Sequence, residues 1–116
     1  MRVKRGIVSR RKHKKTLELT KGYRGSRSTL IRTAKAASLQ AGAYAFQGRK
    51  NKKRDFRQLW ITRIGEAVKQ EGISYSVFIN KLDQLDIELD RKILADLLLN
   101  DPDTFKEIVT MAKTAN

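Results

Sequence analysis

The large hydrophobic residues of this chain gather in its C-terminal half, where they repeat at helical spacing. Residues three and four apart lie on one face of a helix, so each such repeat predicts a helix with one buried face. Four stretches show the repeat, and together their faces predict one small core. The apolar positions are Ile61, Ile64 and Val68, then Phe78, Ile79 and Leu82, then Ile93, Leu94, Leu97 and Leu98, and finally Phe105, Ile108, Val109 and Ala112.

Polar residues in front of three of these stretches predict where the helices begin. Ser74 is a suitable N-cap for a helix over residues 75–85, because its hydroxyl can accept a hydrogen bond from an unpaired backbone amide. Asp90 would cap a helix over residues 91–99 in the same way. Asp101 followed by Pro102 predicts the start of the last helix, since proline is favoured at the first helical position.

The N-terminal half has few large apolar residues, yet its serines and glycines also predict helix ends. We expect Ser9 to cap a short helix that ends at Lys21–Gly22. Glycine there permits the left-handed backbone conformation that closes a helix. Residues 22–25 then form a tight link.

A long helix follows this link. Ser26 or Ser28 would cap it, and it would continue to Glu71, because no proline intervenes and its first part is rich in alanine. Glycine costs on the order of 1 kcal/mol inside a helix. Gly42 and Gly48 therefore predict a bend, with an unbroken helix that tolerates both glycines as the alternative.

No alternating pattern of useful length predicts a strand, so the expected fold class is all-α. A straight helix over residues 26–71 would be roughly 69 Å long. A C-terminal domain of this size has a radius of gyration of only about 10 Å, so much of the helix must project beyond it. The prediction is a long basic helical arm with a bend, residues 1–58, followed by a small globular helical domain, residues 59–116.

Charge divides the chain at the same place. Residues 1–58 contain 19 Lys/Arg and two acidic residues, Glu18 and Asp55, for a net charge of +17. Residues 59–116 contain 7 Lys/Arg and 10 acidic residues, for a net charge of −3, so the two halves sum to +14. Self-repulsion opposes compaction of the first half without an anionic partner. We therefore expect this half to bind a polyanion and the other half to fold by itself.

Several other function classes find no support in the sequence. The chain has no cysteine, and no run of about 18 apolar residues that could span a membrane. Its basic N-terminus lacks the apolar stretch of a signal peptide. His13 is the only histidine and has no nearby carboxylate, and no glycine-rich phosphate loop is present. We expect no enzyme activity, cofactor, metal or small-molecule substrate.

The cations within residues 49–57 would spread widely around a helix. At 100° per residue they cover roughly 200° of a helix circumference. A solvated helix face, the alternative, would be narrower and would carry acidic residues at i+4, whereas here only Asp55 intervenes. The arc favours a helix immersed among phosphates. Its residues are Arg49, Lys50, Lys52, Lys53, Arg54 and Arg57.

Aromatic residues lie within the basic half. Unpaired bases can stack on such rings, which favours folded RNA with bulges and loops over regular duplex DNA. Packing against the alanines is the alternative for Tyr44 and Phe46, and packing next to the domain is expected for Phe56 and Trp60. Tyr23, in its glycine link, is the strongest stacking candidate.

Six motifs spread from end to end closely resemble the L-twenty family of bacterial large-subunit ribosomal proteins. They are residues 2–6 (RVKRG), 21–27 (KGYRGSR), 32–35 (RTAK), 54–61 (RDFRQLWI), 73–76 (ISYS) and 87–92 (IELDRK). The resemblance implies a structural constituent of the large subunit that binds the large ribosomal RNA directly, contacts neighbouring ribosomal proteins and supports early assembly. Some members of the family also bind their own messenger leader and repress its translation.

The resemblance also implies which residues contact RNA. In the arm these are Arg2, Lys4, Arg5, Arg10, Arg11, Lys14, Lys15, Lys21, Tyr23, Arg24, Arg27, Arg32, Lys35, Arg49, Lys50, Lys52, Lys53, Arg54 and Arg57. In the C-terminal domain they are Ser74, Ser76, Asn80, Lys81, Arg91 and Lys92, near helix starts where backbone amides favour phosphate.

The resemblance places the protein in the bacterial cytoplasm, with a plastid ribosome as the alternative location. A DNA-compacting or regulatory nucleic-acid-binding protein is the alternative function, since it would share the charge-driven part of the binding. Such a protein needs a dimer interface or a recognition helix with base-reading residues, and the sequence shows neither.

Overall fold

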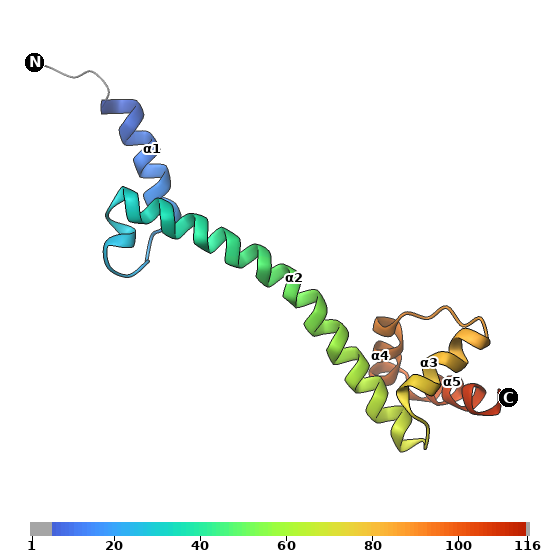
Figure 1. The fold of residues 1–116 in the computed structure, drawn as a ribbon. Helices are drawn as coiled ribbons and strands as arrows, with labels where there is room; N and C mark the ends of the chain where they lie inside the picture. Colours follow the sequence, from blue (N-terminus) through green and yellow to red (C-terminus); the bar gives the residue numbers. More distant parts are fainter. Residues whose placement is uncertain (1–5, 116) are drawn as a thin grey trace, which may run out of the picture. The chain divides into compact units, whose positions relative to one another are not determined.

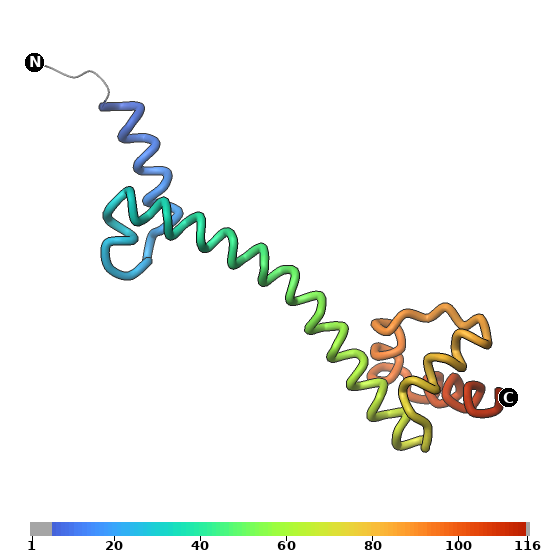
Figure 2. The backbone as a smooth tube through the Cα atoms, viewed as in Figure 1, coloured from blue at the N-terminus to red at the C-terminus, as the bar shows by residue number. Residues whose placement is uncertain are grey.

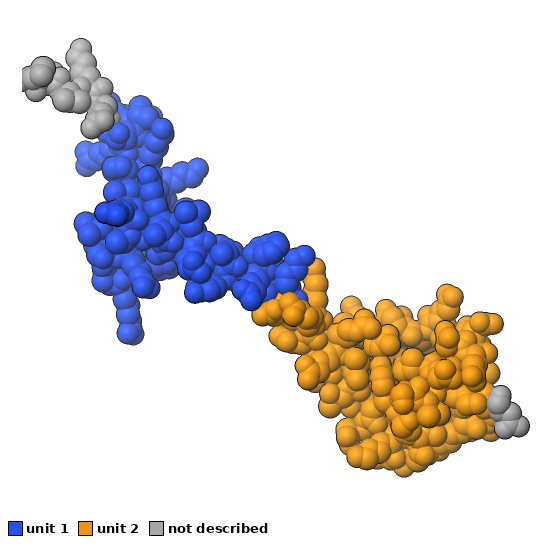
Figure 3. Space-filling model, viewed as in Figure 1, with its two compact units in different colours: residues 1–50 blue, residues 51–116 orange. Residues whose placement is uncertain are grey.

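The computed structural model describes residues 6–115, and every regular element within this range is a helix (Figure 1). This confirms the all-α prediction of a long basic helix that leads into a small helical domain. The chain divides into two compact units, the first ending at Lys50 and the second beginning at Asn51 (Figure 3). The elements are α1 (Gly6–Leu19), the short 3-10 helix η1 (Gly25–Ser28), α2 (Ile31–Gln70), α3 (Tyr75–Gln84), α4 (Arg91–Asn100) and α5 (Pro102–Thr114).

The second unit contains the hydrophobic core. The backbone turns back after α2, so that α3, α4 and α5 gather at the end of this long helix (Figure 2). All four helices contribute buried side chains, as their repeats predict. The two core aromatics, Phe78 and Phe105, pack with ring centroids 6.2 Å apart and tilted planes. The buried residues are Ile64, Val68, Phe78, Leu82, Leu94, Ala95, Phe105, Val109 and Ala112.

Two predicted core positions are wrong. Ile61 is half-buried but is not among the residues that pack against the core. Ile93 is 44% exposed, whereas the next two residues, Leu94 and Ala95, are buried. Each residue of a helix is rotated by about 100° from its neighbour, so the face centred on 94 and 95 leaves Ile93 at its edge. Leu97 and Leu98 pack against the core as partly buried residues.

The three predicted N-caps of the C-terminal helices are confirmed. The Ser74 hydroxyl accepts from the amide of Val77, and the Asp90 carboxylate accepts from the amide of Ile93. The Asp101 carboxylate accepts from both the hydroxyl and the amide of Thr104, at 2.6 and 3.2 Å. These two hydrogen bonds lower the pKa of Asp101, since they favour its ionised form. This contribution to the helix start is present above the ordinary pKa of aspartate and is lost as the pH falls through the lowered value.

The helix starts predicted for the first unit are wrong. α1 begins at Gly6, so Ser9 lies inside the helix. Neither Ser26 nor Ser28 caps the long helix, which begins at Ile31, because both serines belong to η1. The sequence alone does not decide among these three serines, because a serine can hydrogen-bond to the nearby backbone either as a helix cap or within a turn.

α2 is continuous from Ile31 to Gln70. Between these residues the helix is not interrupted at Gly42 or Gly48, which agrees with the alternative of a helix that tolerates both glycines. A left-handed residue, Gly72, with φ +84°, lies two positions after its end. The amides of Gly72 and Ile73 then donate to the carbonyls of Lys69 and Val68, the hydrogen-bond pattern that commonly closes a helix at glycine.

Candidate nucleic-acid interface

Cations cover the first unit and the adjoining part of α2. Every predicted arm cation that the structure describes is exposed, and residues 6–50 contain twelve Lys/Arg against a single acidic residue, Glu18. Arg2, Lys4 and Arg5 lie outside the described residues. The predicted contacts among the exposed cations are Arg10, Arg11, Lys14, Lys15, Lys21, Arg24, Arg27, Arg32, Lys35, Arg49, Lys50, Lys52, Lys53, Arg54 and Arg57.

These cations have no carboxylate partners among residues 6–115. The one ion pair in this range joins Lys113 to Glu71 at 3.0 Å, in the second unit. The repulsion among the arm cations is therefore not relieved within the described chain. A phosphate backbone would relieve it, because each bound cation releases condensed counterions from the nucleic acid.

A first group of these cations meets on α1 and just beyond its C-terminal end. Arg10, Lys14 and Lys21 surround a shallow hollow of about 390 Å³. His13, Leu17 and Glu18 complete its lining. The five lining residues of α1 recur at intervals of three and four residues and share one helix face, whereas Lys21 follows the end of the helix. The structure thus brings three predicted phosphate contacts together at the end of α1.

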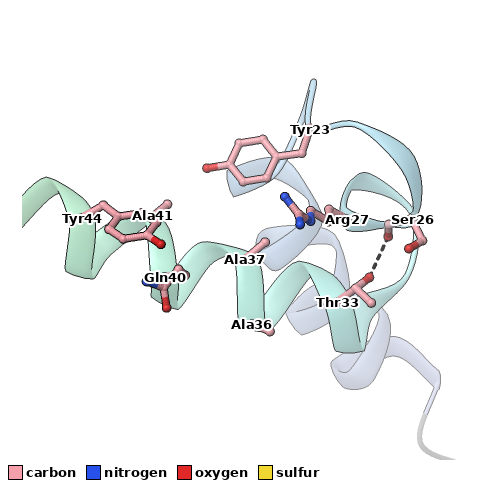
Figure 4. A pocket seen from close by; sticks show the side chains of 9 residues that line it. All are labelled: Tyr23, Ser26, Arg27, Thr33, Ala36, Ala37, Gln40, Ala41 and Tyr44. Atoms are coloured by element: carbon pink, nitrogen blue, oxygen red, sulfur yellow. Dashed lines mark hydrogen bonds between the residues drawn. The ribbon is translucent and has the colours of Figure 1, made fainter.

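A groove separates the loop after α1 from the first turns of α2. It has a volume of about 600 Å³, and the α2 residues in it follow helical spacing along one face. Figure 4 shows the Tyr23 ring extending from the loop over this face, with the Arg27 guanidinium on the same side. The lining residues are Tyr23, Ser26, Arg27, Thr33, Ala36, Ala37, Gln40, Ala41 and Tyr44.

Local sequence features hold the loop that carries Tyr23 and Arg27. Gly22, with φ +84°, takes the left-handed conformation that the sequence predicts for the end of the first helix. Tyr23 follows directly, and its amide donates to the carbonyl of Thr20, which is fully buried. Farther along, the carbonyl of Ser26 accepts from the Thr33 hydroxyl at 2.8 Å, which ties the loop to α2.

Two further aromatic residues of α2 lie beside lysines. Phe46 is 59% exposed, and the Lys50 ammonium lies 5.4 Å from its ring centroid. Phe56 has the Lys52 ammonium at 5.9 Å and the Trp60 ring at 6.2 Å. Trp60 is half-buried against the core, in agreement with the predicted packing role. Phe46, by contrast, does not line the groove that contains Tyr44.

The six predicted contacts of the C-terminal domain do not form one cluster. Ser76, Asn80 and Arg91 line a hollow of about 700 Å³ between α3 and α4, whereas Ser74, Lys81 and Lys92 do not line it. Lys81 donates to the backbone carbonyl of Ala115 at 2.6 Å.

The charge of this hollow is unfavourable for phosphate. Asp83, Asp86 and Glu88 line it together with the three predicted residues. The Nε atom of Arg91 donates to the Tyr75 hydroxyl at 2.8 Å, so the side chain that would meet a phosphate is already engaged on one side. The cationic surface of the described chain therefore belongs to the arm.

Comparison with known proteins finds a family and several relatives that match nearly the whole chain. The family model of Ribosomal protein L20 matches residues 2–108. The Large ribosomal subunit protein bL20 of Bordetella avium is 55% identical over 114 residues, which are 98% of this chain and 96% of the relative. Those of Burkholderia ambifaria and Herminiimonas arsenicoxydans are each 54% identical over at least 97% of this chain and 95% of the relative.

The chain belongs to the Ribosomal protein L20 family. The resemblance found in the sequence motifs is thereby confirmed over nearly the whole chain. As a member of the L20 family, the chain is a structural protein of the large ribosomal subunit and not an enzyme. Within residues 6–115, no helix has both the length and the apolar character that crossing a membrane requires.

Sequence reasoning missed most of the groove in this L20 family member. It singled out Tyr23 and Arg27 as RNA contacts and Tyr44 as a stacking ring, but it did not connect them with Ala36, Ala37 and Ala41. The signal that could have found the groove is the run of alanines on one face of α2, ending at Tyr44. Small residues there leave space between the helix and the loop.

Proposed function

We propose that the chain binds the large-subunit (23S) ribosomal RNA directly through its basic arm and supports an early step of subunit assembly. The observation that carries this proposal is the set of exposed arm cations without carboxylate partners in the described chain. Where RNA segments converge, their phosphates repel one another, and a helix that presents cations around its circumference reduces this repulsion.

The two predicted segments have different parts in this function. Residues 1–58 form the RNA-binding extension, and residues 59–116 form the domain that anchors and orients it. We assign the RNA contacts to the predicted arm residues first. The six residues of the C-terminal domain come second, because acidic side chains surround three of them. Neighbouring large-subunit proteins are the proposed protein partners, and the bacterial ribosome in the cytoplasm is the proposed location.

Repression of its own messenger is a subsidiary part of the proposal. A messenger leader that folds like the ribosomal target would offer the same phosphates and unpaired bases to the arm. The net charge of −3 in residues 59–116 supports little binding by the domain alone, so the arm would be needed for this role as well.

A competition assay tests the proposal. Labelled large-subunit ribosomal RNA bound to the full chain at about 150 mM salt should be displaced by unlabelled ribosomal RNA at concentrations at least about tenfold below those of duplex DNA. Both polymers offer phosphates to the arm cations, whereas only folded RNA also offers splayed bases and irregular grooves. Equal displacement by duplex DNA would instead favour the alternative of a DNA-compacting protein.

A further inference from the structure

The groove between the loop and α2 differs from the rest of the cationic arm in its chemistry. Its floor is made of Ala36, Ala37 and Ala41, and tyrosine rings border it from two different elements. Tyr23 is 36% exposed and Tyr44 is 66% exposed, so both rings keep accessible surface. Phosphates alone would not need an apolar floor or aromatic walls.

The groove suits a flat aromatic ligand that carries negative charge. Its volume of about 600 Å³ falls within the range of about 300–1,000 Å³ that is typical of small-molecule sites. Rings of Tyr offer stacking surfaces to any base, and alanine side chains leave the floor clear. No acidic residue lines the groove, and Arg27 brings guanidinium donors that lack a carboxylate partner within residues 6–115.

We propose that this groove binds one unpaired base of the RNA, stacked on the tyrosine rings, with the Arg27 guanidinium donating to the base edge or to its phosphate. The inference rests on the proposed function and adds to it a site that recognises RNA structure. Cations elsewhere on the arm contact a backbone that every sequence shares. A base pocket would let the arm distinguish a splayed nucleotide from a continuous duplex.

The loop geometry makes this site a defined one. Thr33 holds the Ser26 carbonyl at 2.8 Å, and the amide of Leu30 donates to the same carbonyl at 2.8 Å. Tyr23 and Arg27 therefore stand on a segment that is tied to the helix whose alanines form the floor. Once RNA orders the arm, these hydrogen bonds hold Tyr23 and Arg27 at fixed positions beside the alanine floor.

The test uses the full chain and protein-free bacterial large-subunit ribosomal RNA. Tyr23→Leu and Tyr44→Leu should each weaken binding about 5- to 100-fold, because base stacking on an aromatic side chain is lost. The slope of log affinity against log salt should stay unchanged, because neither tyrosine neutralises a phosphate. Leu39→Ala is the control, since Leu39 is an exposed apolar residue of the same helix outside the groove, and the affinity of this variant should change less than about twofold.

A second readout identifies the base. Chemical probing of the RNA with dimethyl sulfate should find an unpaired base that the wild-type chain and the Leu39→Ala variant protect and the Tyr23→Leu variant leaves reactive. Tyr23→Phe should restore the protection, because the ring is kept. Circular dichroism checks that all variants have the wild-type helix content.

The outcomes separate this inference from the proposed function. If the wild-type chain binds with a steep salt slope but both tyrosine variants behave like Leu39→Ala, the base pocket is wrong and the proposed function stands. A tyrosine variant that loses affinity and salt slope together also overturns the pocket, because phosphate contacts were then disturbed. Failure of the wild-type chain to bind the RNA at all would overturn both.

Discussion

A chain shortened to residues 59–116 will lose most of its affinity for large-subunit ribosomal RNA, together with most of the salt dependence of that affinity. The deletion removes 19 of the 26 Lys/Arg and leaves a net charge of −3. If on the order of ten arm cations meet phosphates, the full chain should show a slope of log affinity against log salt near roughly −9. The shortened chain should show a slope close to zero. Filter binding or fluorescence titration at several salt concentrations measures both quantities.

The shortened chain keeps the residues that its fold requires. All nine buried core residues lie between Ile64 and Ala112, and Trp60 and Ile61 remain as well. A thermal transition with the helix signal of a folded domain is therefore the necessary control. A folded fragment with an undiminished salt slope would show that the arm is not the main contact.

Replacement of Phe78 by alanine should unfold the C-terminal domain. Phe78 is fully buried, contributes to the core from α3 and packs against Phe105. Truncation of a buried phenylalanine costs about 3–5 kcal/mol, through lost burial and the cavity left behind. A domain of this size has only a few kcal/mol of stability in total, since it buries about 60% of its unfolded surface. Chemical denaturation followed by circular dichroism should show the cooperative transition weakened or lost.

Val77 provides the matched control for this substitution. It precedes Phe78 in the same helix but is 46% exposed. Val77→Ala should change the free energy of unfolding by no more than about 1 kcal/mol, because little buried surface is removed. Equal stability of the Phe78→Ala variant and the wild-type chain would mean that the four-helix core does not hold this domain together.

The sequence predicted the C-terminal domain better than the arm, and the reason is physical. In the domain, apolar spacing, N-caps and the glycine at the end of α2 all favour the same boundaries. Ser74, Asp90 and Asp101 cap as expected because each directly precedes a helix whose buried face also fixes its position. Ile93 was misplaced because spacing alone does not say which side of a four-residue apolar cluster faces the core.

In the arm, no core selects among competing local signals. Ser9, Ser26 and Ser28 were all plausible caps, and the structure uses none of them in this way. The family resemblance predicts which arm cations contact RNA. This prediction does not depend on where each helix begins, because the cations are exposed in any case. The groove could not be predicted from spacing, because it depends on a tertiary contact between the loop and α2 through the Ser26 carbonyl and Thr33.

We expect the arm to become ordered when RNA surrounds it. Among residues 6–50 only Thr20 and Ala34 are buried, so the first unit gains little from apolar burial. Ordering costs about 1–2 kcal/mol per residue in backbone entropy, and the unpaired cations add repulsion. We expect RNA phosphates to supply the missing attraction on binding.

Amide hydrogen exchange of the full chain, with and without large-subunit ribosomal RNA, tests this claim most directly. Without RNA, residues 6–50 should exchange almost as fast as an unfolded chain, while residues 60–114 should be protected by their core. With RNA, exchange in residues 6–50 should slow by at least about tenfold. Strong protection of residues 6–50 in the protein alone would contradict the account.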